Sequence, residues 1–383
     1  MKLAVVGRGM IGSAAARHLA KAGQDVTLIG PAEPEDRNDH DGVFGSHYDE
    51  GRITRLLDPH PVWEDLAAAS IARYDDIRAE SGIAFYNPVG LLIGAPEGSE
   101  YLDNVRAVRD GAGVTCRELT GDALRRAYPY LVFDEDMVML HQSDLAGHIS
   151  PRRIVAAQTK AALAHGAALV DEFAVGVRPG AVETPSGIHH FDRVLVACGA
   201  YTNTVLEQPL ALTPLARTIT LFELDEAEAH RLSAMPSVIY RVPDNSSPYV
   251  LPPIRYPDGK MYLKIGGEPV DVPLGRAEAL RAWFQSGGDA GVGMYHMERI
   301  AGLMPDLRFA AAHWDACAVT YTKTGLPYIG DLGDGICVAA GGCGGAAKSS
   351  DEIGRIAAET LLGRPDNRFD VLIEGDGMQG DCA

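Results

Sequence analysis

Short apolar runs alternate with polar turns at the start of the chain. Residues 2–6 and 25–29 are mostly apolar runs, and residues 13–22 place Ala16, Leu19 and Ala20 on one helical face. Apolar residues spaced by three and four predict an amphipathic helix, whereas a short apolar run bounded by turns predicts a buried strand. The first thirty residues are therefore predicted to form a strand, a helix and a second strand.

The same reasoning predicts alternating elements along the rest of the chain. Helices are predicted at residues 62–80, 99–112, 149–166 (with Ser150 and Pro151 at its start), 273–284, 296–303 and 349–362. Strands are predicted at residues 84–93, 168–170, 175–177, 191–201, 316–321 and 336–340, and an antiparallel sheet at residues 213–223 and 238–265. The expected fold class is α/β, with a Rossmann-like domain and an inserted, mostly antiparallel α+β domain. We expect the first domain at residues 1–84, 145–215 and 315–383, and the second at residues 85–144 and 216–314.

A glycine motif lies between the first predicted strand and helix. Gly7, Gly9 and Gly12 form G-x-G-x-x-G, with Met10 and Ile11 inside it. In this context the glycines permit a tight turn, close approach to a pyrophosphate and helix–strand packing, and the helix N-terminus attracts phosphate. The acid expected after the second strand, for the ribose hydroxyls, is replaced by Gly30, and Glu33 is the nearest substitute. This gap weakens an NAD interpretation more than a flavin one.

Composition and charge narrow the function classes. The 383 residues include 46% hydrophobic and 22% charged residues, and the net charge is −18, which argues against nucleic acid or an anionic membrane as a partner. No apolar run reaches the roughly 20 residues that span a bilayer, and no signal peptide is expected. Six cysteines are scattered without a C-x-x-C pair, which favours a reducing compartment and argues against a structural zinc site. We expect a cytoplasmic protein with no metal site.

Four stretches together resemble the FAD-dependent amine oxidases of the D-amino acid oxidase superfamily, most closely the monomeric sarcosine oxidases and N-methyltryptophan oxidases. The stretches are residues 5–29, 45–55, 249–267 and 319–350. The strand at residues 194–201, which ends in Gly199-Ala200-Tyr201, is similar to the Gly-Ala-Trp element of this family. The resemblance implies FAD as the cofactor and a monomeric enzyme.

The resemblance also implies roles for individual residues. Gly45-Ser46-His47 and Arg52-Ile53-Thr54-Arg55 match the family pattern G-S-H-x-x-x-x-R-I-x-R, which places Ser46, His47 and Arg52 at the flavin and Arg55 on the substrate carboxylate. Lys264 aligns with the lysine at which oxygen reacts, and Lys348 with a lysine that pairs with the substrate carboxylate. Tyr249 and Tyr321 align with aromatic residues of the substrate pocket.

Three positions depart from the pattern. Relatives attach FAD covalently to a cysteine where this chain has Val319, and Cys317 is about 6.6 Å away along an extended strand. We therefore expect non-covalent FAD. Tyr48 replaces a histidine, and Glu268 stands near the position of an active-site histidine, which implies a substrate other than sarcosine, larger or cationic.

The same residues have simpler interpretations. Arg55 could form a surface salt bridge, and Lys264 could lie on the solvent face of a strand. His47 could have a structural role, Cys343 could be a packing residue, and Tyr249 and Tyr321 could belong to the core. The glycine-rich turn with Gly342, Gly344 and Gly345 fits a structural turn, or a helix start that directs its positive end, with Lys348, at the flavin. In the functional interpretation, Arg55 and Lys348 are two cations that bind the substrate carboxylate. Lys264 is then a fixed cation that stabilises developing superoxide.

The leading hypothesis is an oxidase. FAD accepts a hydride from the carbon next to the amine nitrogen of an amino acid or N-alkyl amino acid, the imine hydrolyses, and O2 reoxidises the flavin to give H2O2. The alternatives are a dehydrogenase with another electron acceptor and a non-catalytic nucleotide-binding protein. The sequence does not distinguish primary, secondary and cyclic amines.

Overall fold

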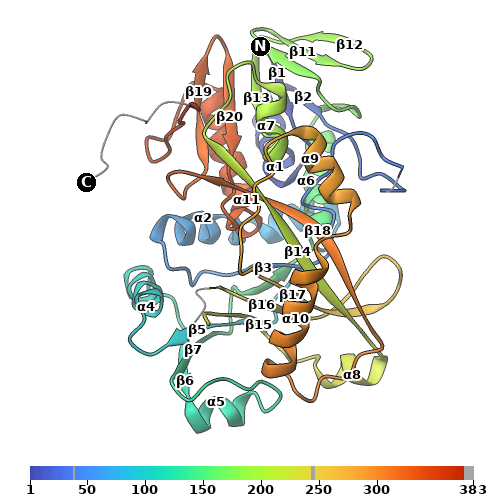
Figure 1. Cartoon of the computed structure of the whole chain (residues 1–383). Coiled ribbons are helices and arrows are strands. Elements are labelled where there is room, and N and C mark those ends of the chain that lie inside the picture. Colours follow the sequence, from blue (N-terminus) through green and yellow to red (C-terminus); the bar gives the residue numbers. More distant parts are fainter. Residues whose placement is uncertain (38, 243–245, 375–383) are drawn as a thin grey trace, which may run out of the picture.

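A six-stranded sheet forms one half of the computed structural model, which describes residues 1–37, 39–242 and 246–374. Its strand order is β19-β20-β13-β1-β2-β9. All neighbours are parallel except β19 and β20, which are antiparallel. The strands are β1 (Lys2–Val6), β2 (Asp25–Ile29), β9 (Ala168–Val170), β13 (Arg193–Val196), β19 (Tyr328–Gly333) and β20 (Ile336–Ala340). This is the α/β sheet that the sequence predicts, and Figure 1 shows it beside the N-terminus.

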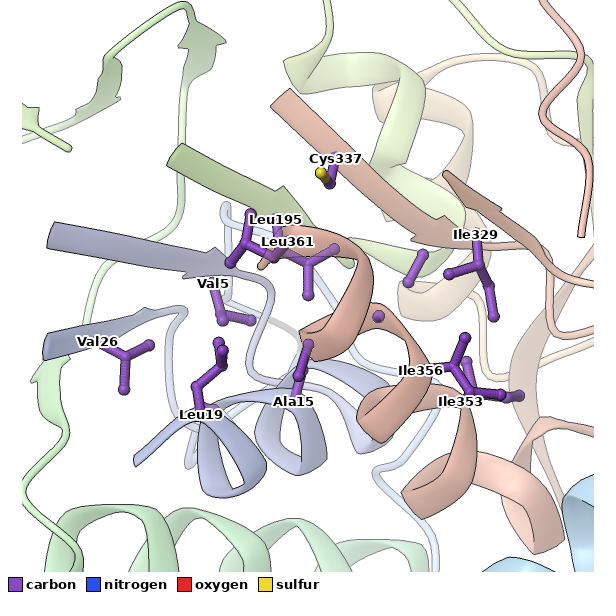
Figure 2. Packing of buried hydrophobic residues seen from close by; sticks show 14 of the residues in the cluster. Val5, Ala15, Leu19, Val26, Leu195, Ile329, Cys337, Ile353, Ile356 and Leu361 are labelled. Carbon is purple, nitrogen blue, oxygen red and sulfur yellow. The ribbon is translucent and has the colours of Figure 1, made fainter. Parts of the chain in front are cut away.

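Helices α1 (Met10–Lys21) and α11 (Ala346–Leu361) pack together on one face of this sheet. Figure 2 shows Leu19 and Ala15 of α1 on the side of Val5, and Ile353 and Ile356 of α11 on the side of Ile329, all within one apolar cluster. Helices α2 (Pro61–Ile71) and α6 (Pro151–Ala164) cover α11 and α1 in turn. The first strand–helix–strand unit is therefore confirmed, with its helix facing a fully buried core.

An eight-stranded sheet forms the other half, in the order β18-β14-β17-β16-β15-β5-β7-β6. Every pair is antiparallel except β15 and β5. Its strands are β5 (Leu91–Pro96), β6 (Arg117–Thr120), β7 (Met137–Gln142), β14 (Leu212–Leu224), β15 (Ser237–Tyr240), β16 (Tyr249–Arg255), β17 (Met261–Gly266) and β18 (Ala311–Thr322). In Figure 1 the long strands β14 and β18 run diagonally from one half of the molecule to the other.

Smaller elements complete the fold. One three-stranded sheet contains β3 (Arg52–Thr54), β8 (Gly147–Ile149) and β4 (Tyr86–Asn87). A second three-stranded sheet contains β10 (Gly176–Arg178), β11 (Ala181–Thr184) and β12 (Gly187–His190). The remaining helices are α3 (Tyr74–Ser81), α4 (Glu100–Ala112), α5 (Gly121–Ala127), α7 (Thr202–Val205), α8 (Glu226–Arg231), α9 (Ala277–Gln285) and α10 (Ala290–Leu303), with a 3-10 turn at Gly199–Tyr201. No helix among the described residues has the length and apolar character to cross a bilayer. The five cysteines in the described part of the chain are free, and Cys382 lies outside it.

Several predicted boundaries are wrong for identifiable reasons. The helix predicted at residues 62–80 is divided into α2 and α3 at Arg73, whose side chain reaches Asp351 and Glu352 of α11. The helix predicted from residue 273 begins only at Ala277, because Pro273 and Leu274 pair with β14. Helix α10 begins six residues before the predicted start, where the Asp289 side chain caps it. The sequence did not predict β6, α5, β7 or β8.

A buried carboxylate joins three helices and the turn between α2 and α3. Asp351 of α11 lies 3.4 Å from Arg17 Nη1, 3.1 Å from His18 Nε2, 2.5 Å from Arg73 Nε and 2.8 Å from Gln158 Nε2. Burial alone would raise the pKa of Asp351, but His18 and Arg73 outweigh it and hold that pKa well below its usual range. The ionised form is therefore part of the folded structure.

Replacing this carboxylate should destabilise the protein. Asp351→Asn removes the charge and leaves the buried Arg17 and the partly buried Arg73 without it, so we expect a loss of about 3–5 kcal/mol in the free energy of unfolding. Because the folded-state pKa is lowered, this stability is present above the unfolded pKa of about 3.9 and is lost as the pH falls below it. Chemical denaturation at several pH values measures both effects.

The matched control is Asp75→Asn, since Asp75 pairs with Arg78 at 3.1 Å but is 90% exposed. It should change stability by less than about 1 kcal/mol. Equal losses in the two variants would contradict the role given to Asp351.

Candidate active site

A cavity lies where the parallel strands of the six-stranded sheet end. Its wall includes the last residues of β1, β2 and β20 and the residues after β13, which is the edge where open α/β sheets bind ligands. It is lined by residues 6–11, 29–31, 43–48, 52, 173–174, 197–201, 204–205, 317–320, 340–342, 344 and 346–347. Segments from both ends of the chain thus meet at one cavity.

Two glycines bring the backbone to close contact at this edge. Gly7 has φ +110°, and a Cβ atom on it would lie 2.3 Å from the carbonyl oxygen of Ala197. A Cβ atom on Gly12 would lie 1.8 Å from the carbonyl oxygen of Gly7. Any side chain at either position would push apart the first strand, α1 and the segment after β13.

The cavity has the features that a dinucleotide requires. Helices α1 and α11 both begin at its wall, so their free N–H groups and positive ends are available to phosphates or to a polar ring edge. Arg8 Nη1 is buried without a hydrogen-bond partner, 3.4 Å from Asp171, and can donate to an anion. The residues present therefore fit FAD.

Most of the predicted cofactor residues line this cavity. They are Gly7, Gly9, Met10, Ile11, Ser46, His47, Arg52, Gly199, Gly342 and Gly344. Gly12, Glu33, Gly345 and Lys348 do not line it. Gly12 packs against Gly7, and Gly345 lies against the Trp63 ring, so both act on the shape of the wall.

Glu33 is engaged by two arginines. Its carboxylate accepts from Arg152 Nε at 2.5 Å and from Arg37 Nη2 at 3.0 Å. Burial would raise the pKa of Glu33, but these two arginines outweigh it and lower that pKa. A role at the ribose stays a prediction, and it would require the carboxylate to leave one of these partners.

His47 is enclosed at the cavity wall. Burial lowers the pKa of His47 to about 4, so the ring is neutral near pH 7. Its ring stacks edge-on with Tyr48 at 4.7 Å between centroids. His47 can therefore offer a neutral donor or acceptor to a cofactor, but no charge.

Arg52 and Lys264 are joined by one buried carboxylate. Asp49 forms ion pairs with both cations and accepts a hydrogen bond from Tyr256 at 2.8 Å. Lys264 is fully buried and also donates to the carbonyl oxygen of Gly51 at 2.7 Å. The solvent-facing interpretation of Lys264 is therefore wrong.

Opposing effects act on the Lys264 ammonium. Burial lowers the pKa of Lys264 well below its usual value, and the charge of Arg52 acts in the same direction. Asp49 acts oppositely, since a carboxylate in contact with an ammonium favours its charged form. With Arg52 in the cavity wall, this cluster places a buried positive charge directly behind that wall.

Arg55 and Lys348 are joined by a second buried carboxylate. Asp58 Oδ2 lies 2.9 Å from Arg55 Nη2 and 3.4 Å from Lys348 Nζ. Lys348 is 1% exposed and donates to the carbonyl oxygen of Trp63 at 2.7 Å. Burial lowers the pKa of Lys348 to about 8, with Asp58 opposing the shift and Arg55 adding to it. The two predicted clamp residues, Arg55 and Lys348, therefore lie close together, and both contact the Asp58 carboxylate.

Tyr321 and Glu268 lie beside Arg217, and Tyr249 lies beside Lys264. The Arg217 guanidinium carbon is 5.6 Å from the Tyr321 ring centroid, and its Nε is 3.4 Å from Glu268. Burial raises the pKa of Glu268 to about 7 although Arg217 opposes the shift. Lys264 Nζ lies 5.8 Å from the Tyr249 ring centroid, which connects Tyr249 to the Asp49 cluster.

Val319 and Cys317 both line the cavity. Cys317 Sγ accepts from Arg52 Nη2 at 3.1 Å, so the thiol faces the arginine predicted at the flavin. Cys198 also lines the cavity, and burial raises the pKa of its thiol to about 12.

Sequence analysis missed four residues of this region: Asp49, Asp58, Arg217 and Tyr256. A weak signal existed for the aspartates, because each lies three residues from the arginine that it contacts. Arg217 pairs with Cys317 across β14 and β18, a register that cannot be deduced without knowing which strands are neighbours. Tyr256 lies at the end of β16 and gave no signal.

Known proteins resemble this chain over most of its length. The family model described as FAD dependent oxidoreductase (DAO) matches residues 2–360. Monomeric sarcosine oxidase from Bacillus sp. (strain B-0618) is 24% identical over 250 residues, which cover 63% of this chain and 62% of that protein. N-methyl-L-tryptophan oxidase from Yersinia pestis (strain Pestoides F) is 23% identical, covering 65% and 67%.

Among solved structures, a variant of NikD, an unusual amino acid oxidase essential for nikkomycin biosynthesis, shares the fold. It has a TM-score of 0.78 and 20% identity, and the match covers 97% of both chains. Because the match covers 97% of this chain, the shared fold includes both the six-stranded and the eight-stranded sheet.

Proposed function

The chain belongs to the family of FAD-dependent oxidoreductases that the DAO model describes, and we propose that it is an oxidase of an amino acid or N-alkyl amino acid. FAD is its cofactor. The observation that carries the proposal is the buried Asp49 cluster, in which Asp49 joins Lys264 to Arg52, a residue of the cavity wall. A fixed buried cation beside a redox cofactor is suited to stabilise negative charge on oxygen.

FAD, when bound, would supply the acceptor for a hydride from the carbon next to the amine nitrogen and would pass two electrons to O2, which gives H2O2, and water would hydrolyse the imine. In this proposal Arg52 contacts the cofactor from the cavity wall. The contact with Asp49 keeps the Lys264 ammonium protonated, and its positive charge lies where oxygen is reduced. Because both are buried, their charges act in a low dielectric.

Arg55 and Lys348 bind the substrate carboxylate in this proposal. A planar guanidinium and an ammonium that approach from different segments suit such a group. Tyr249 and Tyr321 supply aromatic walls. Glu268, with a pKa near 7, is suited to hold or accept a proton at the substrate amine.

We also propose the organisation that the sequence predicts. FAD is held without a covalent bond. The FAD-binding and substrate-binding domains follow the predicted boundaries. The predicted FAD-binding domain includes residues 375–383, which lie outside the described residues. The protein is a cytoplasmic monomer in this proposal, and the free cysteines of the described residues suit that location.

The direct test of the proposed function is a two-stage flavin assay. The holoprotein is mixed without oxygen with N-methyl, cyclic and primary amino acids in turn, and loss of the yellow absorbance is followed. We expect one class to bleach the flavin and admitted oxygen to restore the colour with one H2O2 per turnover. Bleaching without oxygen uptake would favour a dehydrogenase, and no bleaching by any amine would contradict the proposal.

Lys264→Met should separate the two half-reactions. Reduction by substrate should stay within a few fold of wild type, whereas reoxidation by oxygen should slow by about 10²–10³-fold, because one preorganised charge is removed. Stopped-flow mixing measures each step. Lys260→Met, which alters an exposed lysine paired with Glu223 just before β17, is the matched control and should alter neither. Equal slowing of both steps in Lys264→Met would refute its role at oxygen.

Acid precipitation should release all of the FAD. Val319 offers no nucleophile, and the high pKa of Cys198 keeps that thiol protonated. We expect a yellow supernatant and a colourless pellet after trichloroacetic acid. A yellow pellet that becomes colourless in Cys317→Ser would instead show attachment at Cys317.

A further inference from the structure

Asp58 occupies the position where a substrate carboxylate would meet Arg55 and Lys348. One oxygen, Oδ2, contacts both cations, and the other, Oδ1, accepts from the backbone N–H of His60 at 3.1 Å. The Asp58 side chain is only 7% exposed. A carboxylate fixed on three donors in this way is how a protein would hold a bound acid.

Two acids act on the two cations of this cluster. Asp58 contacts both Arg55 and Lys348, and Glu64 of α2 adds a negative charge that acts on Lys348 of α11. Arg55 Nε is buried and has no hydrogen-bond partner among the described residues. An incoming carboxylate would therefore have to compete with Asp58 for the two cations and, in the described part of this cluster, would find only Arg55 Nε without a partner.

This cluster adjoins the cofactor cavity. Ala347, which precedes Lys348, lines the cavity, and so does Arg52, three residues before Arg55. Gly345 packs on the Trp63 ring, whose centroid lies 5.6 Å from Lys348 Nζ. Arg55, Asp58 and Lys348 themselves do not line the cavity, but they are held by residues that do or that pack on it.

We propose that Asp58 is a resident competitor for the substrate carboxylate, so that a free α-carboxylate contributes little to binding in this protein. This inference rests on the proposed function, because it takes Arg55 and Lys348 as the carboxylate clamp. A substrate acid must displace Asp58 from Arg55 or share the two cations with it. Specificity then depends on the amine and its substituents, and amides or esters of the amino acid bind about as well as the free acid.

The test compares two ligands that cannot be oxidised. Propionate carries the carboxylate, and propionamide has nearly the same shape without charge. Calorimetry on the FAD-loaded protein at pH 6.5, where Lys348 is protonated, should give weak and similar affinities in wild type. In Asp58→Asn, propionate should bind about tenfold tighter or more, since it gains the charge-assisted contacts that Asp58 held, and propionamide should not change.

Controls separate this effect from general electrostatics and from folding. Asp65→Asn changes an exposed acid of α2, 3.6 Å from Arg368, and should alter neither affinity. If Asp58→Asn does not fold, the comparison is made in a Lys348→Met background, where the added Asp58→Asn should still tighten propionate. Unchanged or weaker propionate binding, or an equal gain for propionamide, overturns the inference.

The outcome is independent of catalysis. Failure of every amine to bleach the flavin would remove the proposed function even if propionate responds to Asp58→Asn. If amines bleach the flavin but Asp58→Asn leaves the propionate affinity unchanged, only this inference is overturned.

Discussion

The architecture of the site depends on the need to neutralise buried cations. Lys264 and Lys348 are almost completely inaccessible to water, and an unpaired ammonium in such a place would lose its proton or unfold its surroundings. The chain meets this need with two aspartates, Asp49 and Asp58, which lie in one short stretch. Each joins an arginine of that stretch to a lysine far away in the sequence.

The two sheets bring these remote lysines to the same stretch. Lys264 comes from β17 in the eight-stranded sheet, and Lys348 from α11 on the six-stranded sheet. Strand β18 connects the two regions, because its Thr320 carbonyl accepts from the N–H of Cys343 in the glycine-rich turn before α11. Apolar packing of α1 and α11 against the parallel strands fixes that turn at the cavity (Figure 2).

The sequence predicted the parts whose signal is local. The strand–helix–strand unit has a strict hydrophobic period and glycines that no other residue could replace, and Ser150 does cap α6. The residues missed are those whose role depends on distant partners. Asp49 and Asp58 look like solvent-exposed acids until β17 and α11 are placed beside them, and Arg73 interrupts a continuous helical pattern because it pairs with α11.

The most direct measurement of the central claim is a crystal structure of the protein with FAD bound. The account predicts that the isoalloxazine ring lies against Arg52, with Lys264 still paired to Asp49 behind it and the Arg55–Lys348 pair on the substrate side. A ring bound away from Arg52, or a structure in which Lys264 and Lys348 point into solvent, would contradict it.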